Sequence, residues 1–308
     1  ISSKYWPVFE EGSSYSTLTI SPRFFNVIFF VLRVCGLLCF VAVLLAGFWG
    51  SGNPLLNLAP NFIWITWWLG FSISISLIGN FWPLCNPWET LFSISSWLLS
   101  SLGFKRTTNN PPLFFPDYLG LYLATGFLLA WSWMEVIYPI AFVPNRVASI
   151  AIVWTLVNLS GMYLFGKSVW LQRGDVFSLY FSMLGQFGIF SYSHRGLGLR
   201  LRLPGEGVLL DSNSWRQISG VAAFIIAMLA IVLFDGLHGS QAWALFTQML
   251  QSIGFIELGS DDYLTGTVGL ISVWLFFLGL MFVLTTLFLP NGLLGVYHQI
   301  FGKKGGIK

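Results

Sequence analysis

Apolar runs of roughly 20 residues recur along this chain, and they constrain its fold more than any other feature. A helix rises about 1.5 Å per residue, so each run is long enough to cross a hydrocarbon core about 30 Å thick. Only 9% of the residues are charged, too few to cover a soluble fold of 308 residues. The strands of a membrane barrel would alternate polar and apolar residues, and the runs do not alternate. We therefore predict an all-α, polytopic transmembrane helical bundle.

Six such runs divide the chain. We expect spans at about residues 24–47, 61–81, 117–138, 144–166, 218–234 and 264–289. They define three regions, namely a juxtamembrane arm (1–22), a transmembrane domain (23–290) and a basic C-terminal tail (291–308). Lys and Arg favour cytoplasmic loops, and most of those in this chain fall on one side of the six spans. We therefore expect an integral protein of a prokaryotic cytoplasmic membrane, with both termini in the cytoplasm.

The segment 175–190 is ambiguous because it is short and interrupted by serines and glycines. Basic residues lie on both sides of it, at Lys167 and Arg173 before it and between Arg195 and Arg216 after it. A re-entrant segment keeps both basic loops in the cytoplasm, whereas a full crossing gives a seventh span. The following motif GLGLRLRLPGEG (196–207) alternates Leu and Arg, which favours an extended or hairpin segment at the anionic membrane face.

A cluster of Trp, Pro, Cys and Glu follows the second run. Asn86 is a preferred N-cap residue, Pro87 suits the first helical position, and Glu89 has the spacing of a capping box. These signals predict an amphipathic interfacial helix over 87–102. A catalytic interpretation would use Glu89 with Cys85 as nucleophile, but no histidine stands near to activate the thiol. We assign Glu89 to capping alone, so Glu89→Gln is expected to be tolerated.

Charged residues within or at the ends of the apolar runs are the other candidates for function, because charge in hydrocarbon is costly. They are Arg33, Glu135, Asp175 and Asp235. The predicted topology places Arg33 and Glu135 at different depths, which argues against a direct ion pair between them. For each carboxylate, solvation at a helix end is the simpler interpretation, and a substrate or proton role is the alternative.

No cofactor or metal is predicted, and a bound lipid is expected. The three histidines His194, His238 and His298 fall at membrane ends on both sides, which suits neither a haem held between helices nor a three-ligand zinc site. Cys35 and Cys39 share a helix face at a spacing of four, and we interpret them as small packing residues.

Three short motifs resemble a known family. They are NPW (86–88), W-x4-D-x-F (Trp170, Asp175, Phe177) and FDG (234–236). Their order and spacing resemble a family of uncharacterised bacterial and archaeal polytopic membrane proteins, some of which are labelled fenitrothion-hydrolase-like. The resemblance covers roughly residues 60 to 290 and implies a helical membrane fold. Members of that family continue with further membrane helices, which leaves the completeness of this chain open.

Three classes of function compete. An accessory subunit of a larger membrane complex needs broad apolar surfaces, which suit the 18% of aromatic residues. A small-solute transporter or channel needs a polar pathway, for which Ser72, Ser74 and Ser76 are candidates. A membrane-embedded hydrolase, as the family label implies, needs an acid–base or metal constellation, and we cannot assemble one. We favour the non-catalytic subunit.

The expected partners are the lipid bilayer and other membrane subunits, with no nucleic acid. Small residues let helices approach closely in a membrane. Gly120 with Ala124, or Gly269 with Ser272, is expected to pack against a partner helix.

Overall fold

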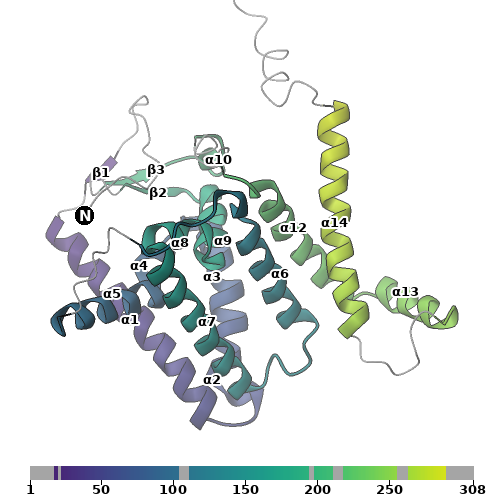
Figure 1. The fold of residues 1–308 in the computed structure, drawn as a ribbon, viewed down its shortest axis with the longest axis horizontal. Coiled ribbons are helices and arrows are strands. Elements are labelled where there is room, and N and C mark those ends of the chain that lie inside the picture. Colours follow the sequence, from purple (N-terminus) through teal and green to yellow (C-terminus); the bar gives the residue numbers. More distant parts are fainter. Residues whose placement is uncertain are drawn as a thin grey trace, which may run out of the picture. The chain divides into compact units, whose positions relative to one another are not determined.

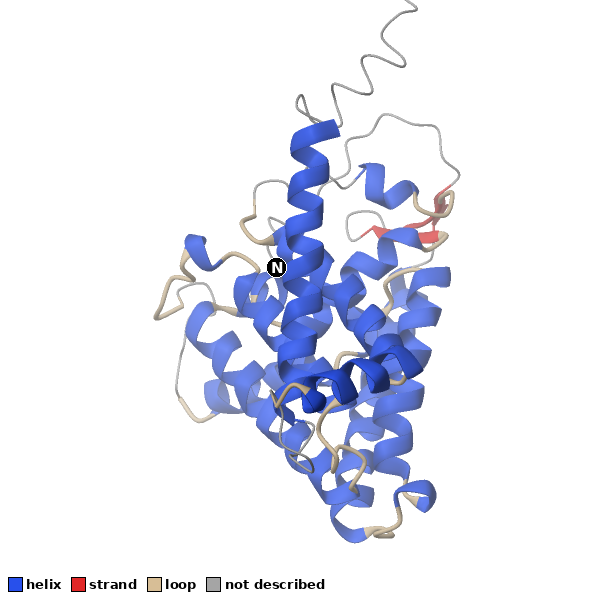
Figure 2. Ribbon diagram, turned by 90° about the vertical axis from the view of Figure 1, so that its right-hand side faces the viewer, coloured by secondary structure: helices blue, strands red, loops and turns tan. Residues whose placement is uncertain are grey.

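The computed structural model shows a predominantly helical protein, as the sequence predicts (Figures 1 and 2). It describes residues 17–19, 22–103, 111–193, 198–210, 218–254 and 263–288. The chain forms two compact units, the first built from residues 1–128 and 138–221 and the second from 129–137 and 222–308. The boundaries proposed for an N-terminal arm and a basic tail lie largely outside the described residues and stay predictions.

Five helices in the described part of the chain are long and apolar enough to cross a membrane. They are Asn26–Trp49, Leu58–Ile78, Pro144–Phe165, Val221–His238 and Tyr263–Leu284, and each overlaps a predicted span. The third predicted span, 117–138, is not among them. Its helix α6 (Tyr122–Val136) has 15 residues, so it covers only about 22 Å. Gly120, at φ +42°, separates α6 from a 3-10 turn, η3 (Asp117–Leu119). The structure thus supports five of the six predicted spans.

The first two candidate spans belong to unit 1. Helix α1 (Pro22–Trp49) contains the first, and the second is assembled from three consecutive pieces, α2 (Leu58–Pro60), η2 (Asn61–Gly70) and α3 (Phe71–Ile78). A 3-10 turn, η1 (Pro54–Leu56), connects them. The middle piece η2 is a ten-residue π-helix, a conformation that is rare in proteins and often marks functional sites. It contributes three buried indole rings, those of Trp64, Trp67 and Trp68.

Unit 1 continues with three shorter helices and a further candidate span. The shorter helices are α4 (Trp82–Cys85), α5 (Pro87–Ser101) and α8 (Lys167–Arg173), and the span is α7 (Pro144–Phe165). Helix α5 runs across α1 rather than alongside it (Figure 1). Its first turns are buried, whereas Trp97 and Leu98 are exposed. This exposed apolar end is consistent with the interfacial position predicted for the helix.

The ambiguous segment after Asp175 folds as a short buried helix. Helix α9 (Val176–Leu184) and the 3-10 turn η4 (Gly185–Phe187) together cover about 18 Å, so the segment is too short to cross a bilayer and the seven-span alternative is wrong. Phe177 and Phe181 are 2% and 0% exposed. Six of the nine residues of α9 are buried, so this helix lies inside the protein.

A small antiparallel sheet follows α9. Strand β3 (Gly198–Leu201) is central, with β2 (Phe190–Ser193) on one side and β1 (Thr17–Thr19) on the other. Arg200 is opposite Thr17 in one ladder and Ser191 in the other. The extended segment expected in the Leu-Arg motif is confirmed as β3, its position at the membrane face stays a prediction, and the short helix α10 (Glu206–Leu210) ends this region.

Unit 2 is built from the end of α6 and three helices, α12 (Val221–His238), α13 (Gln241–Ser252) and α14 (Tyr263–Phe288). Tryptophan side chains connect these helices. Trp133 of α6 donates through Nε1 to Thr267 Oγ1 at 2.7 Å, and Trp274 of α14 donates to the carbonyl oxygen of Ala223 at 3.2 Å. Hydrogen-bonding the indole N–H in this way satisfies its only donor.

Candidate functional site

Helix α5 begins where the sequence predicts. Asn86 occupies the N-cap position, and its Oδ1 accepts from the backbone N–H groups of Trp88 (2.9 Å) and Glu89 (3.2 Å). Pro87 follows at the first helical position, where a missing N–H leaves no hydrogen bond unmade. At the other end Gly103 adopts φ +88°, the left-handed conformation that glycine favours after a helix.

The carboxylate of Glu89 does not complete the expected capping box. Its Oε1 accepts from Arg33 Nη2 at 2.8 Å and from Lys167 Nζ at 3.0 Å. The guanidinium of Arg33 also lies 4.2 Å from the ring centroid of Phe29, a cation–π contact. The assignment of Glu89 to capping alone is therefore wrong, because this side chain joins α1, α5 and α8 through one ion-pair cluster, Arg33–Glu89–Lys167.

This cluster also explains how a membrane helix accommodates Arg33. Lys167 lies two residues after the candidate span Pro144–Phe165, and the carboxylate that it shares with Arg33 links that helix end to α1. Pairing with this carboxylate lowers the cost of placing Arg33 within the candidate span Asn26–Trp49. Arg33 pairs with Glu89, and Glu135 lies in the last turn of α6.

A second polar group, the Asp175 network, lies inside unit 1. Asp175 is 0% exposed, and its Oδ2 accepts from Ser178 Oγ at 2.5 Å. Asn86, the N-cap of α5, donates in turn to Ser178 Oγ at 3.4 Å. On the other side Trp170 donates to Asn158 Oδ1 at 2.8 Å. These five residues bring together α5, α7, α8 and the start of α9.

Two atoms of the Asp175 network are left without a hydrogen bond of normal geometry. They are Asp175 Oδ1 and Asn158 Nδ2, both buried. Trp170 donates to Asn158 Oδ1, which leaves the Nδ2 donor of that amide for the carboxyl group of Asp175. A hydrogen bond from Asn158 stabilises the charged form of Asp175 and so lowers its pKa. Burial nevertheless raises the pKa of Asp175 from 3.8 to about 6, and the hydrogen bond from Ser178 opposes that rise.

Aromatic rings surround this network. The ring of Trp67 lies 4.6 Å from that of Phe177, 5.7 Å from Trp82 and 6.1 Å from Trp88, measured between centroids. Trp88 and Phe177 are stacked, with 17° between their planes. Two of the three sequence motifs, NPW and W-x4-D-x-F, therefore meet in one packed core. The third, FDG, lies in unit 2, where Asp235 is exposed in the last turn of α12.

Two of the three serines proposed as a polar pathway form hydrogen bonds within their own helix. Ser72 donates to the carbonyl oxygen of Trp68 at 2.5 Å, and Ser76 donates to that of Ser72 at 2.7 Å. Back-bonding of this kind satisfies a serine within its own helix. The structure therefore shows these two serines engaged with the backbone of the second candidate span.

The groups considered for nucleophilic or metal chemistry are dispersed. Burial raises the pKa of the Cys85 thiol to about 12, with Cys39 adding to the rise, which leaves it protonated at neutral pH. His238 packs against the rings of Phe234 and Trp243 in unit 2. The other histidines, His194 and His298, lie outside the described residues. Within the described ranges, no three His, Cys, Asp or Glu side chains come together as metal ligands.

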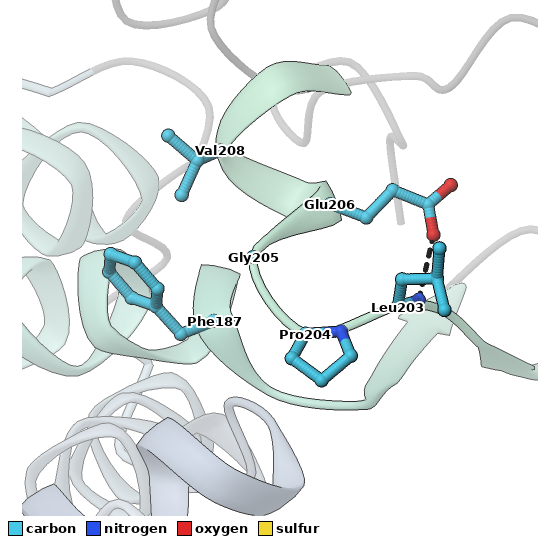
Figure 3. A pocket seen from close by; sticks show the side chains of 6 residues that line it. All are labelled: Phe187, Leu203, Pro204, Gly205, Glu206 and Val208. Carbon is cyan, nitrogen blue, oxygen red and sulfur yellow. Dashed lines mark hydrogen bonds between the residues drawn. The ribbon is translucent and has the colours of Figure 1, made fainter.

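A shallow pocket of about 470 Å³ lies beside α10 (Figure 3). Its lining is Phe187, Leu203, Pro204, Gly205, Glu206 and Val208. The one carboxylate there, that of Glu206, is turned to its own loop, where Oε2 accepts from the backbone N–H of Leu203 at 2.9 Å. The pocket thus presents mainly apolar side chains and no catalytic pair.

Two glycines expected to meet partner helices are instead packed against residues of the same chain. A Cβ at Gly120 would lie 2.0 Å from the carbonyl oxygen of Ser219, and one at Gly269 would lie 2.3 Å from the Trp243 ring. Both glycines therefore permit close packing inside their own unit, and the prediction that they face a partner is wrong.

Comparison of the chain with protein-family models, with curated proteins and with solved structures finds no match. The resemblance to the fenitrothion-hydrolase-like family stays a prediction that rests on the three motifs.

Proposed function

We propose that this chain is a non-catalytic structural subunit of a larger membrane-protein complex. The observation that carries the proposal is the exposure of α14. In the most apolar 18 residues within Tyr263–Leu284 only 6% are buried, against 39% in Val221–His238 of the same unit. A spanning helix with so few contacts to its own chain has most of its surface available for another helix.

The exposed surface of α14 has features that suit helix packing. Val268, Ser272, Leu275 and Gly279 follow a spacing of three and four residues along one exposed face. A Cβ at Gly279 would meet nothing within 4 Å. Small residues on an apolar face let a second backbone approach closely, and van der Waals packing drives helix association in lipid.

The Arg33–Glu89 pair and two serines of the second candidate span also support a structural role. Arg33 is neutralised by Glu89 within the chain, and Ser72 and Ser76 bond to their own helix. These side chains stabilise the bundle and are not arranged as a route for solute.

Photo-crosslinking in native membranes tests the proposal. A photoreactive amino acid at Leu275, which is 51% exposed, should give a discrete adduct with another polypeptide. The same amino acid at Leu270, which is 2% exposed on the same helix, is the matched control and should give none. If Leu275 yields adducts with lipid alone, the subunit proposal is wrong.

A small-solute transporter is the second candidate, and the Asp175 network is the observation that favours it. A carboxyl group that is fully buried without a paired cation is a common element of proton-coupled transport. Purified protein in liposomes, with a proton gradient imposed and candidate solutes supplied, tests this role. Transport by the wild type that Asp175→Asn abolishes would favour it, and an unaffected or absent flux would not.

A further inference from the structure

We infer that helix α13 lies in the interface between water and hydrocarbon, with one apolar face inserted among the lipids of the bilayer that α12 and α14 cross. Only Gly239 and Ser240 separate α13 from the end of α12. Ser240 caps α13, and its Oγ accepts from the backbone N–H of Trp243 at 3.3 Å. With so short a connection, α13 begins directly at the membrane face where α12 ends.

The sequence of α13 divides cleanly between two faces. Leu245, Phe246 and Met249 are 58%, 46% and 59% exposed, and Ile253, one residue past the helix, is 65% exposed. At 100° per residue these four side chains fall on one side. The opposite side carries Thr247, Gln248 and Gln251, and Gln241 and Ser252 lie at the boundary beside Leu245. A helix with this division lies parallel to a boundary between apolar and aqueous phases.

The buried side chain of Trp243 sets the depth of the helix. Its ring lies 5.6 Å from that of Phe234 on α12, and it fills the space beside Gly269 on α14. Phe234 is about 6 Å before the end of α12, and Gly269 is about 9 Å after the start of α14, at 1.5 Å per residue. Interfacial helices bury their apolar faces about 5–10 Å below the membrane surface, so both estimates place α13 at that depth.

The direction of α13 agrees with this position. In Figure 1 α13 lies beside the lower end of α14 and points away from it, rather than running parallel to it. Because α14 is a candidate span, an axis across it lies along the membrane plane.

Lipid is the occupant that these observations favour. Trp243 holds α13 against the two candidate spans α12 and α14, so the bilayer that they cross adjoins the exposed apolar side chains of α13. The helix carries no charged residue, so insertion depends on apolar area and not on anionic headgroups. The inference requires only that the chain is membrane-embedded, and it goes beyond the proposed role as a subunit.

Fluorescence quenching of the isolated full-length chain tests the inference. An environment-sensitive fluorescent amino acid is placed at Met249 or, as the matched control, at the neighbouring Gln248, in phosphatidylcholine nanodiscs. Brominated lipid should quench the probe at 249 several-fold more than the probe at 248, and aqueous iodide should show the reverse order. Replacing a third of the lipid with an anionic one should change neither ratio.

Equal iodide quenching at both positions would overturn the inference, as would a probe at 249 that neither quencher reaches, because protein would then cover this face. A probe at Leu245 repeats the test if the chain with the label at 249 does not fold. Because no partner is present in the nanodiscs, the result is independent of the crosslinking at Leu275.

Discussion

Arg33 and Glu89 form an ion pair of 2.8 Å between residues 56 positions apart in the sequence, one within α1 and the other in the first turn of α5. The side chain of Glu89 is 14% exposed and that of Arg33 is 20% exposed. The pair holds the start of α5 against the first candidate span, and Lys167 joins it from α8.

Replacing Glu89 by Gln should therefore destabilise the protein. The change leaves two cations without their carboxylate, and we expect a loss of about 2 kcal/mol, between the ~1 kcal/mol of an exposed pair and the 3–5 kcal/mol of a broken buried one. Thermal unfolding in detergent, followed by circular dichroism, measures the loss. The double variant Arg33→Gln with Glu89→Gln should recover part of it. If Glu89→Gln is as stable as the wild type, the ion pairs of Glu89 do not contribute to stability and its role is capping alone.

Asp175→Asn should stabilise the protein at neutral pH. The folded-state pKa of about 6 lies above the unfolded value of 3.8, so the stabilising contribution of this group is fully present below pH 3.8 and is lost as the pH rises through about 6. Asn cannot ionise, and the variant should gain up to about 3 kcal/mol above pH 6.

Unfolding midpoints of both proteins from pH 4 to pH 8 test that prediction. The unfolding midpoint of Asp175→Asn should exceed that of the wild type only slightly at pH 4, and this difference should grow until about pH 7. Ser178→Ala removes the donor to Asp175 Oδ2 and should raise the pKa of Asp175 further. In that background the difference caused by Asp175→Asn should therefore grow at higher pH. A difference that stays constant with pH would contradict the assignment of the titration to Asp175.

Trp170→Phe should leave the oxygen of a buried amide unsatisfied. Trp170 is the donor to Asn158 Oδ1, and Asn158 is 0% exposed. Losing that donor is expected to reduce the free energy of unfolding by about 1–3 kcal/mol. Adding Asn158→Leu to the same chain removes the stranded amide and should restore some stability. If the two losses simply add in a double-mutant cycle, the hydrogen bond does not contribute as proposed.

Two helical glycines should respond in opposite ways to alanine. A Cβ at Gly36 would lie 2.0 Å from the carbonyl oxygen of Cys85, so Gly36→Ala forces α1 away from α4 and should cost about 3 kcal/mol or more. A Cβ at Gly126 would meet nothing within 4 Å, and Gly126→Ala should stabilise α6 by about 0.5–1 kcal/mol. Chemical denaturation in detergent compares them, and equal effects would contradict the close contact at Gly36.

Local signals in the sequence were sufficient for the start of α5 and for most spans. Asn86 and Pro87 predict a helix start because the capping side chain bonds to backbone N–H groups only two and three residues further along the chain. A run of about 20 apolar residues is likewise enough to predict a span. The span predicted at 117–138 was wrong because hydropathy alone does not register the turn at Gly120, whose φ of +42° interrupts the helix.

The candidate site was predictable only in part. Asp175 could be singled out as a charge in an apolar context. Asn158 and Asn86, the other amide-bearing members of its network, are distant from it in sequence, and neither asparagine stands out from the sequence alone. Glu89 was misassigned because its capping spacing is visible locally, whereas Arg33 and Lys167 approach it only through tertiary packing. Motif spacing did offer one usable signal, since the residues of NPW and W-x4-D-x-F meet at Trp88 and Phe177.

The pairing of β1 with β3 sets an order for events during biosynthesis. Thr17 pairs with Arg200, so roughly 180 residues must leave the ribosome before the first strand finds its neighbour. At about 5–20 residues per second this takes about 10–40 s. Through that interval α1 is already available for membrane insertion while Thr17–Thr19 remains an unpaired strand. The sheet therefore forms late, because β1 can pair with β3 only after α7 and α9 have been synthesised.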